Sequence, residues 1–204
     1  PEINQEKDLI IFMPGLGGDV ENFSWLGSGL SKKGWPVILI EHKGSDSFAL
    51  NSSIRGDEAL PGGADIYLYR IKDLNSVINA YKKDQLGFKN SNSYILMGHS
   101  LGGLISLLYE GNPPNNEFVS RCENALNNLA LTNVSQLLQC QLLEIPIPEY
   151  QKSKELKAIV GFNSFGSLIW SNKENSGINV PLLFIGGTFD LITPLVSEQF
   201  KLFL

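Results

Sequence analysis

Short, mostly apolar runs alternate along this chain with longer segments in which apolar residues recur at helical spacing. The runs have strand length and little polar alternation, which is typical of strands buried on both faces. They cover residues 8–13, 37–41, 94–97, 157–162 and 181–185. The pattern therefore predicts a series of buried strands.

Helices are predicted between these runs. One helix face is marked at 3.6-residue spacing by Ile71, Leu74, Ile78 and Tyr81, so residues 65–84 are predicted to be helical. Further helices are predicted from Asp19 to about Lys33, from Leu101 onward and from about Pro194, whereas the turn formers of 42–64 predict a long surface loop. Buried strands alternating with amphipathic helices predict an α/β fold with a mostly parallel, doubly wound sheet.

Composition narrows the class of protein. With 204 residues, 43% hydrophobic and 18% charged, the chain has the size and composition of a single globular domain with a real core. Its apolar runs fall far below the roughly 20 residues of a membrane helix, so no integral membrane segment is expected. A net charge of -5 without a basic cluster argues against nucleic acid as a partner. Oligomeric state is left open.

The ends of the chain bear on whether it is truncated, and the two cysteines bear on its cellular location. The chain begins at Pro1 and stops at Leu204, in what the pattern predicts is a helix just begun, so we expect both ends to be truncated. Cys122 and Cys140 allow one disulfide or two buried thiols. The expected location is cytoplasmic by default, and periplasmic or secreted if the cysteines are bridged.

The stretch 94–103 carries the strongest chemical signal. A strand-like run ends in G-x-S-x-G, and apolar residues then continue at helical spacing. Strand, sharp turn and helix around a serine are typical of a nucleophile elbow, which exposes the serine hydroxyl at the carboxyl end of the strand. We predict that Ser100 is a nucleophile with a positive φ, and that Gly98 and Gly102 flank it because side chains there would collide with the neighbouring strand and helix.

A serine nucleophile also needs oxyanion donors, an acid and a base. Leu101 N–H, at the start of the helix, and Leu16 N–H, in the glycine-rich loop 14–18, are the predicted oxyanion donors. Asp190, which follows the last strand and two glycines, is the predicted acid, although a turn or capping role is the alternative.

Neither histidine fits the role of base. The His99 side chain is expected to point away from Ser100, and His42 comes too early in the chain order of serine, acid and histidine. We therefore expect the catalytic histidine beyond Leu204. Two histidines without metal-ligand spacing also predict that the protein has no metal site.

Residues 111–150 interrupt the alternation. Pro113-Pro114 ends a helix, and 115–144 mixes Asn, Gln and Leu in two predicted short helices before further prolines stop them. We predict that 111–150 is a helical lid insertion over the active face of the single domain 1–204.

Together these motifs resemble an α/β-hydrolase. The resemblance rests on Gly98-His99-Ser100-Leu101-Gly102, Pro14-Gly15-Leu16-Gly17-Gly18 and Gly187-Thr188-Phe189-Asp190. Two further stretches, 41–47 and 136–140, are similar to bacterial, often cyanobacterial, dienelactone hydrolases predicted from sequence and related to platelet-activating-factor acetylhydrolases. The resemblance covers 8–204 and implies a serine esterase or lipase that acts on a small-molecule acyl ester without metal or organic cofactor.

The chain departs from that family at two points. Pro14 stands where the family usually has histidine, and true dienelactone hydrolases use a cysteine nucleophile where this chain has Ser100. The family name therefore does not identify the substrate.

Three other functions compete with the esterase. A non-catalytic hydrolase-fold binding module would explain the missing histidine, and an acyltransferase would use the same acyl-enzyme. A dinucleotide-binding domain would explain Gly15-x-Gly17 and a following strand ending in Glu41, but the third glycine of that fingerprint would fall at Val20.

Overall fold

The protein is described by a computed structural model that covers residues 7–57, 63–87, 91–128, 134–146 and 152–203. Five parallel strands form one sheet in the order β2-β1-β3-β4-β5. Their bounds are Leu9–Met13 (β1), Val37–Leu39 (β2), Tyr94–His99 (β3), Leu156–Phe162 (β4) and Leu182–Ile185 (β5). Each predicted apolar run contains one of these strands, so the predicted parallel α/β sheet is confirmed.

The strand order reverses between β1 and β3. β1 pairs with β2 on one side and with β3 on the other, and Met13 lies opposite Gly98 in the register. In open α/β sheets, ligands bind at such a switch point, outside the carboxyl ends of the strands. The loop 14–18, which follows β1, and Ser100, which follows β3, both lie next to this point.

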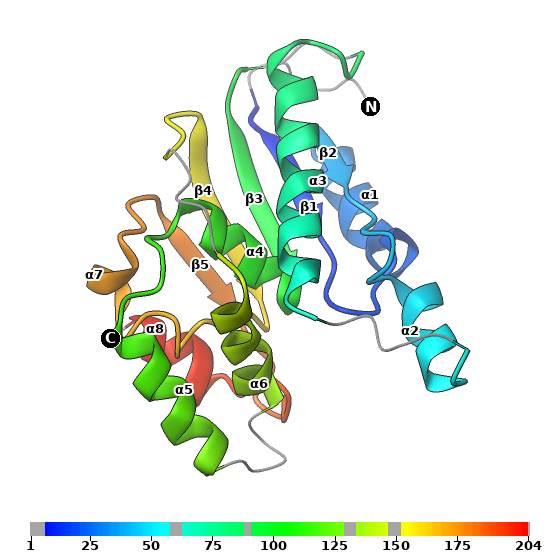
Figure 1. The fold of residues 1–204 in the computed structure, drawn as a ribbon. Helices are drawn as coiled ribbons and strands as arrows, with labels where there is room; N and C mark the ends of the chain where they lie inside the picture. The colour runs from blue at the N-terminus through cyan, green and yellow to red at the C-terminus, as the bar shows by residue number, and fades with distance from the viewer. Residues whose placement is uncertain (1–6, 58–62, 88–90, 129–133, 147–151, 204) are drawn as a thin grey trace.

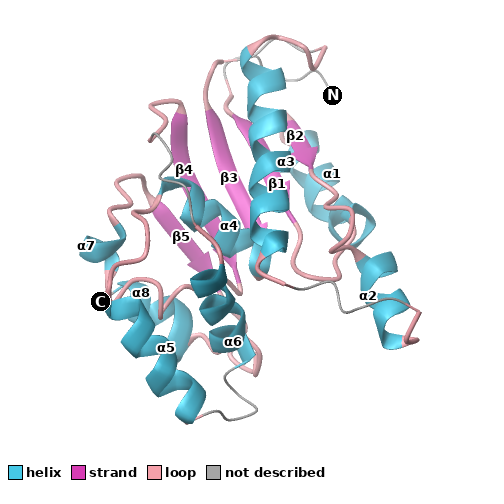
Figure 2. Cartoon of the chain, viewed as in Figure 1, coloured by secondary structure: helices cyan, strands magenta, loops and turns pink. Residues whose placement is uncertain are grey.

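The described ranges also contain eight α-helices, two 3-10 helices (η1 and η3) and one π-helix (η4). They are η1 (Val20–Phe23), α1 (Ser24–Lys32), α2 (Ser47–Ile54), α3 (Asp65–Lys82), α4 (Leu101–Glu110), α5 (Glu117–Asn127), α6 (Val134–Cys140), η3 (Gln141–Glu144), α7 (Lys173–Ser176), η4 (Val196–Phe200) and α8 (Lys201–Phe203). Figure 1 shows α3 running across one face of the sheet. Figure 2 shows α5 and α6 together at the end to which the strand arrows point, with α2 at the same end but on the opposite side of the view. No helix in these ranges is both long and apolar enough to cross a membrane.

Two predicted elements differ from the structure. The long surface loop predicted for 42–64 contains α2, because the Asp46 carboxylate accepts the Ala49 N–H at 2.9 Å and so caps a helix that the turn formers around it obscure. The single helix predicted from Asp19 is divided into the 3-10 turn η1 and the helix α1.

The helix α4 lies at the centre of the core. All ten of its residues are buried, and so is every residue of β1. A helix that is apolar on all sides needs cover on all sides, since apolar surface is stable only out of water. The sheet covers one side of α4, and the helix α3 also packs against it.

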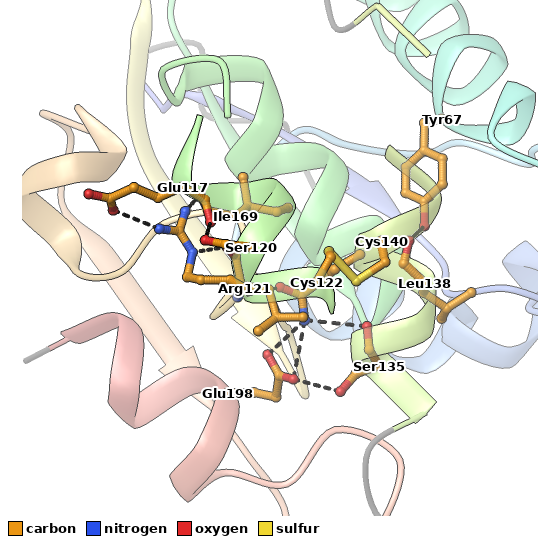
Figure 3. Close-up of a disulfide and its surroundings, with 12 residues drawn as sticks. Tyr67, Glu117, Ser120, Arg121, Cys122, Ser135, Leu138, Cys140, Ile169 and Glu198 are labelled. Atoms are coloured by element: carbon orange, nitrogen blue, oxygen red, sulfur yellow. Dashed lines mark hydrogen bonds and ion pairs between the residues drawn. A yellow bond between two sulfur atoms is a disulfide. The ribbon is translucent and has the colours of Figure 1, made fainter. Parts of the chain in front are cut away.

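The predicted insertion contains α5 and α6, and a disulfide joins these two helices. Cys122 and Cys140 are bridged with a Cα–Cα distance of 5.6 Å, which confirms the bridged alternative (Figure 3). The insertion is also tied to the domain by hydrogen bonds, because the Tyr67 hydroxyl on α3 donates to the Leu138 carbonyl on α6. That the insertion acts as a lid stays a prediction.

Buried Glu198 makes the second tie to the insertion. Its carboxylate accepts hydrogen bonds from the Ser135 hydroxyl at 2.6 Å and from the Gln139 amide at 3.1 Å, both on α6 (Figure 3). It also accepts the backbone N–H groups of Gly166 and Ser167, each at 3.2 Å. One carboxylate thus joins η4, the insertion and the loop after β4.

Reduction of the disulfide should lower the free energy of unfolding by about 3 kcal/mol, because the bridge closes an 18-residue separation and so restricts the unfolded chain. Urea unfolding with and without dithiothreitol measures this loss. The double variant Cys122→Ser, Cys140→Ser should unfold at the reduced midpoint and should not respond to dithiothreitol. Equal midpoints for the oxidised and reduced protein would contradict a bridge in solution.

Candidate active site

Ser100 occupies the turn between β3 and α4. Its backbone has φ 50 and ψ -117, which confirms the predicted positive φ in a region that side chains rarely adopt. The Ser100 N–H donates to Phe162 O of β4 at 2.8 Å, and its carbonyl accepts the Leu104 N–H at 3.1 Å. The serine is therefore held in a strained conformation by the sheet on one side and by the helix on the other.

The glycines around Ser100 allow this turn. A Cβ at Gly98 would lie 2.2 Å from the Gly102 carbonyl carbon, and a Cβ at Gly102 would lie 2.0 Å from Met13 O of β1. Contacts this short do not occur, so neither position accepts a side chain. The predicted collisions with the neighbouring strand and helix are confirmed.

The glycine-rich loop 14–18 lies directly against this turn. A Cβ at Gly15 would lie 3.1 Å from the Ser100 Cβ and 3.0 Å from the His99 Nδ1. The loop is closed by backbone hydrogen bonds, since Gly17 N–H donates to Ser45 O at 2.8 Å and Gly18 N–H donates to Gly15 O at 3.2 Å. Leu16 lies between the residues that make these bonds.

Leu16 and Leu101 thus lie in the two segments that meet at Ser100, one in the loop and one as the first residue of α4. The first N–H groups of a helix have no partner within the helix and favour negative charge. Convergence of the Leu16 and Leu101 N–H groups on one point stays a prediction.

Asp190 lies in the turn that follows β5, and its carboxylate is fully engaged. One oxygen accepts the backbone N–H groups of Ile192 and Thr193, at 2.8 and 2.9 Å. The other accepts the Thr193 hydroxyl at 2.8 Å and the Asn163 side-chain amide. Burial raises the pKa of Asp190, but the hydrogen bonds from Thr193, Asn163 and Ile192 outweigh burial and hold its pKa below the ordinary value. The carboxylate is therefore ionised at neutral pH.

His99 is packed beside the elbow. Its ring lies 5.5 Å from the ring of Phe23, and its Nδ1 faces the position of Gly15. Burial lowers the pKa of His99, while the negative charge of Asp190 opposes that shift. His99 is therefore a neutral packing residue at neutral pH.

His42 is buried in the loop that follows β2. Its Nδ1 lies 2.8 Å from the Asp73 carboxylate on α3. Burial, together with the charge of Arg70, lowers the pKa of His42 to about 4, against the opposing effect of Asp73. His42 lines a cavity of about 450 Å³ with Arg70 and Asp73, and Ser100 is not among the residues that line it. The structure thus pairs His42 with Asp73 and not with Asp190.

Some residues of this region were missed by the sequence analysis. Asn163 follows β4 at the same edge of the sheet as Ser100 and Asp190, and this position was the available signal. Arg70 and Asp73 lie on α3, where Arg70 interrupts the apolar face between Ile66 and Leu74. Over the described residues, no group of three or more His, Cys, Asp or Glu side chains could hold a metal ion.

Solved structures with a similar fold include esterases and other hydrolases. The carboxylesterase Cest-2923 of Lactobacillus plantarum WCFS1 matches with a TM-score of 0.51 and 13% identity, over 96% of this chain and 65% of that one. A second structure from this strain, also assigned as a carboxylesterase, matches with a TM-score of 0.53 and 14% identity, over 98% and 70%. The dienelactone hydrolase of Anabaena variabilis ATCC 29413 matches with a TM-score of 0.48 and 12% identity, over 96% and 82%. At these identities the likeness to the two Lactobacillus plantarum structures shows the fold alone.

The chain spans less than half of two other matched hydrolases. It covers 41% of an extracellular α/β-hydrolase from a Paenibacillus species and 46% of the esterase Est2 of Thermogutta terrifontis. A comparison with curated protein sequences gave no match.

The sequence itself matches the family profile described as alpha/beta hydrolase fold, over residues 8–133. That match runs from β1 through the glycine-rich loop 14–18 and the turn at Ser100 into the insertion, and it covers more than half of the chain. Together with the parallel sheet and the strained Ser100 between two obligatory glycines, it shows that this chain belongs to the α/β-hydrolase fold family.

Proposed function

We propose that the protein is a serine hydrolase that cleaves acyl esters through an acyl-enzyme on Ser100. The observation that carries the proposal is the turn at Ser100, where a strained serine follows the central strand β3 and lies against the glycine-rich loop 14–18. Strain of this kind in a residue other than glycine persists only where the surrounding structure imposes it, and it is concentrated at functional sites.

The proposed reaction has two steps at one carbon atom. The Ser100 Oγ attacks the acyl carbon, the carbonyl oxygen becomes an oxyanion, and the bond to the alcohol oxygen breaks as the alcohol takes the serine proton. Water then attacks the acyl carbon, the bond to the Ser100 Oγ breaks as that oxygen takes a proton from the water, and the acid is released. The N–H groups of Leu16 and Leu101 are the proposed oxyanion donors in both steps.

Asp190 is the proposed acid that orients the base. Its position after β5 and its lowered pKa support this role, because an ionised carboxylate at the carboxyl edge of the sheet can accept an imidazole N–H. His42 is engaged by Asp73 and His99 is packed on Phe23, so we assign the base to a histidine beyond Leu204. Because Cys122 and Cys140 are bridged, we also place the protein in an oxidising compartment, periplasmic or extracellular.

Two alternative functions compete with this proposal. An acyltransferase would share the acyl-enzyme and would differ only in the acceptor that attacks it. A hydrolase-fold binding module would leave Ser100 unreactive, and the pairing of His42 with Asp73 instead of Asp190 is the observation on its side.

Reaction of the full-length protein with a fluorophosphonate probe separates the catalytic readings from the binding module, because only an activated serine is labelled. The native protein should be labelled once, and Ser100→Ala should not be labelled. Ser106→Ala is the matched control, since this buried serine lies in α4, the helix that follows Ser100, and its hydroxyl donates to Gly102 O at 3.0 Å; its loss should leave labelling intact. A native protein that resists the probe would rule out the acyl-enzyme.

The two aspartates near the histidines, Asp190 and Asp73, allow a test of the acid. Asp190→Asn should lower kcat for p-nitrophenyl acetate by about 10⁴-fold, because the amide cannot stabilise an imidazolium. Asp73→Asn is the matched control on the other histidine-linked carboxylate and should change kcat by less than about threefold. The reverse result, with loss of activity in Asp73→Asn and in His42→Ala, would assign the base to His42.

A further inference from the structure

Arg70 is a charged residue in a position where the helix pattern calls for an apolar one. It lies on α3 in line with Ile66 and Leu74, on the face that packs against the domain. Only 1% of its surface is exposed, so the guanidinium is inside the protein. The hydrogen bonds of the guanidinium therefore indicate its role.

Every hydrogen bond that the Arg70 side chain makes in the described structure goes to the two loops that leave β1 and β2. Nη1 donates to Pro14 O at 2.6 Å, and Nη2 donates to Gly15 O at 3.0 Å. Nε donates to the Ser45 hydroxyl at 2.9 Å, and Nη2 also approaches Ser45 O at 3.3 Å. The planar fork of one side chain thus holds two successive carbonyls of loop 14–18 and fastens them to the loop of Ser45.

The burial of Arg70 is unfavourable for stability. Burial lowers its pKa to about 10, with Asp73, Tyr67 and Asp46 opposing that shift, and the side chain is still a cation at neutral pH. No carboxylate within the described ranges forms an ion pair with it. A buried charge without an ion pair lowers stability unless hydrogen bonds compensate for its lost hydration, and an apolar side chain at this position would pack without that penalty. The carbonyl contacts are therefore the feature that an apolar residue would not supply.

One of these carbonyls belongs to the same peptide group as the Leu16 N–H. The Gly15 carbonyl and the Leu16 N–H share one planar peptide unit, and no cis peptide bond occurs in the described chain. In a trans peptide, C=O and N–H point in opposite directions. A donor fixed on Gly15 O therefore directs the Leu16 N–H away from Arg70.

The neighbouring contacts fix the same loop on both sides. Gly15 packs against Ser100, with 3.1 Å between its ideal Cβ position and the Ser100 Cβ. Gly17 N–H donates to Ser45 O at 2.8 Å, and Ser45 is itself held by Arg70. Leu16 thus lies between two residues whose backbone positions depend on Arg70 and its partner Ser45.

We propose that Arg70 is a positioning residue of the oxyanion hole, which orients the Leu16 N–H and strengthens it as a donor through the Gly15 carbonyl. The inference rests on the proposed function, since it needs an oxyanion at Ser100. A charged donor on a carbonyl polarises the peptide, so the N–H of that peptide becomes a better donor. Preorganised donors of this kind act where charge develops in the transition state.

The test compares two substrates that differ in one atom. In p-nitrophenyl thionoacetate, sulfur replaces the carbonyl oxygen of p-nitrophenyl acetate, and sulfur accepts hydrogen bonds only weakly. In the full-length protein, Arg70→Met should lower kcat for the oxygen ester by roughly 10- to 100-fold, with KM changed by less than about twofold. For the thionoester, kcat should fall by less than about threefold, so the ratio of kcat for the oxygen ester to kcat for the thionoester should fall.

Arg121 provides a matched control. Its Nε donates to Leu168 O at 2.7 Å and its Nη2 donates to Ile169 O at 2.9 Å, so it also binds two carbonyls of one loop, but on the side of the insertion (Figure 3). Arg121→Met should lower the urea midpoint and leave the ratio of the oxygen ester to the thionoester unchanged. Arg70→Lys, which keeps the charge and loses the fork, should lower that ratio by a smaller factor than Arg70→Met.

Each outcome decides between a positioning and a structural role. Equal losses on both substrates in the Arg70 variants, or no loss on either, would overturn the proposal. Loss of cooperative folding in both Arg70→Met and Arg70→Lys would assign Arg70 to stability alone and would also overturn it. If the hydrolysis by the native protein persists in Ser100→Ala, the proposed function itself fails, and that result does not depend on Arg70.

Discussion

The close approach of α4 to the sheet at Gly98 and Gly102 is the constraint on which the rest of the structure depends. Side-chain atoms are absent exactly where the helix start meets β1 and β3, so the first turn of α4 can begin directly at the carboxyl edge. The helix is then buried along its whole length, and it needs strands on one side and helices on the other. The strain at Ser100 follows from the same approach, because the chain must turn within one residue.

Two buried ionisable side chains, Arg70 and Glu198, hold the loops at the carboxyl edge of the sheet. Arg70 donates to the loops after β1 and β2, and Glu198 accepts from the insertion and from the loop after β4. Each charge is satisfied mainly by backbone groups and neutral side chains, which limits the cost of burial without an ion pair. The loops on both flanks of Ser100 are thus fixed by polar contacts, whereas α4 beneath them is fixed by packing.

The sequence predicted those features that are encoded locally. Apolar runs of strand length located all five strands, and G-x-S-x-G located the turn, because a strand, a turn and a helix leave their signals within ten residues of one another. The contacts of the site lie far apart in the chain: Asn163 meets Asp190 across 27 residues, His42 meets Asp73 across 31, and Arg70 meets Gly15 across 55. No spacing rule connects such pairs, since their meeting depends on the strand order. The local signs of these contacts were the charge of Arg70 on an apolar helix face and the position of Asn163 directly after β4.

The four hydrogen bonds of Asp190 limit how a catalytic base could bind there. An ionised carboxylate offers about four lone-pair directions, and the described structure fills them with two backbone N–H groups, the Thr193 hydroxyl and the Asn163 amide. The two backbone donors belong to the turn itself and cannot leave without unfolding it. The Thr193 hydroxyl differs, because rotation about one bond withdraws its proton and supplies other partners. An imidazole N–H that binds Asp190 would therefore take the place of one of the two side-chain donors to the same carboxylate oxygen, the Thr193 hydroxyl or the Asn163 amide, while the two backbone donors keep hold of the other oxygen.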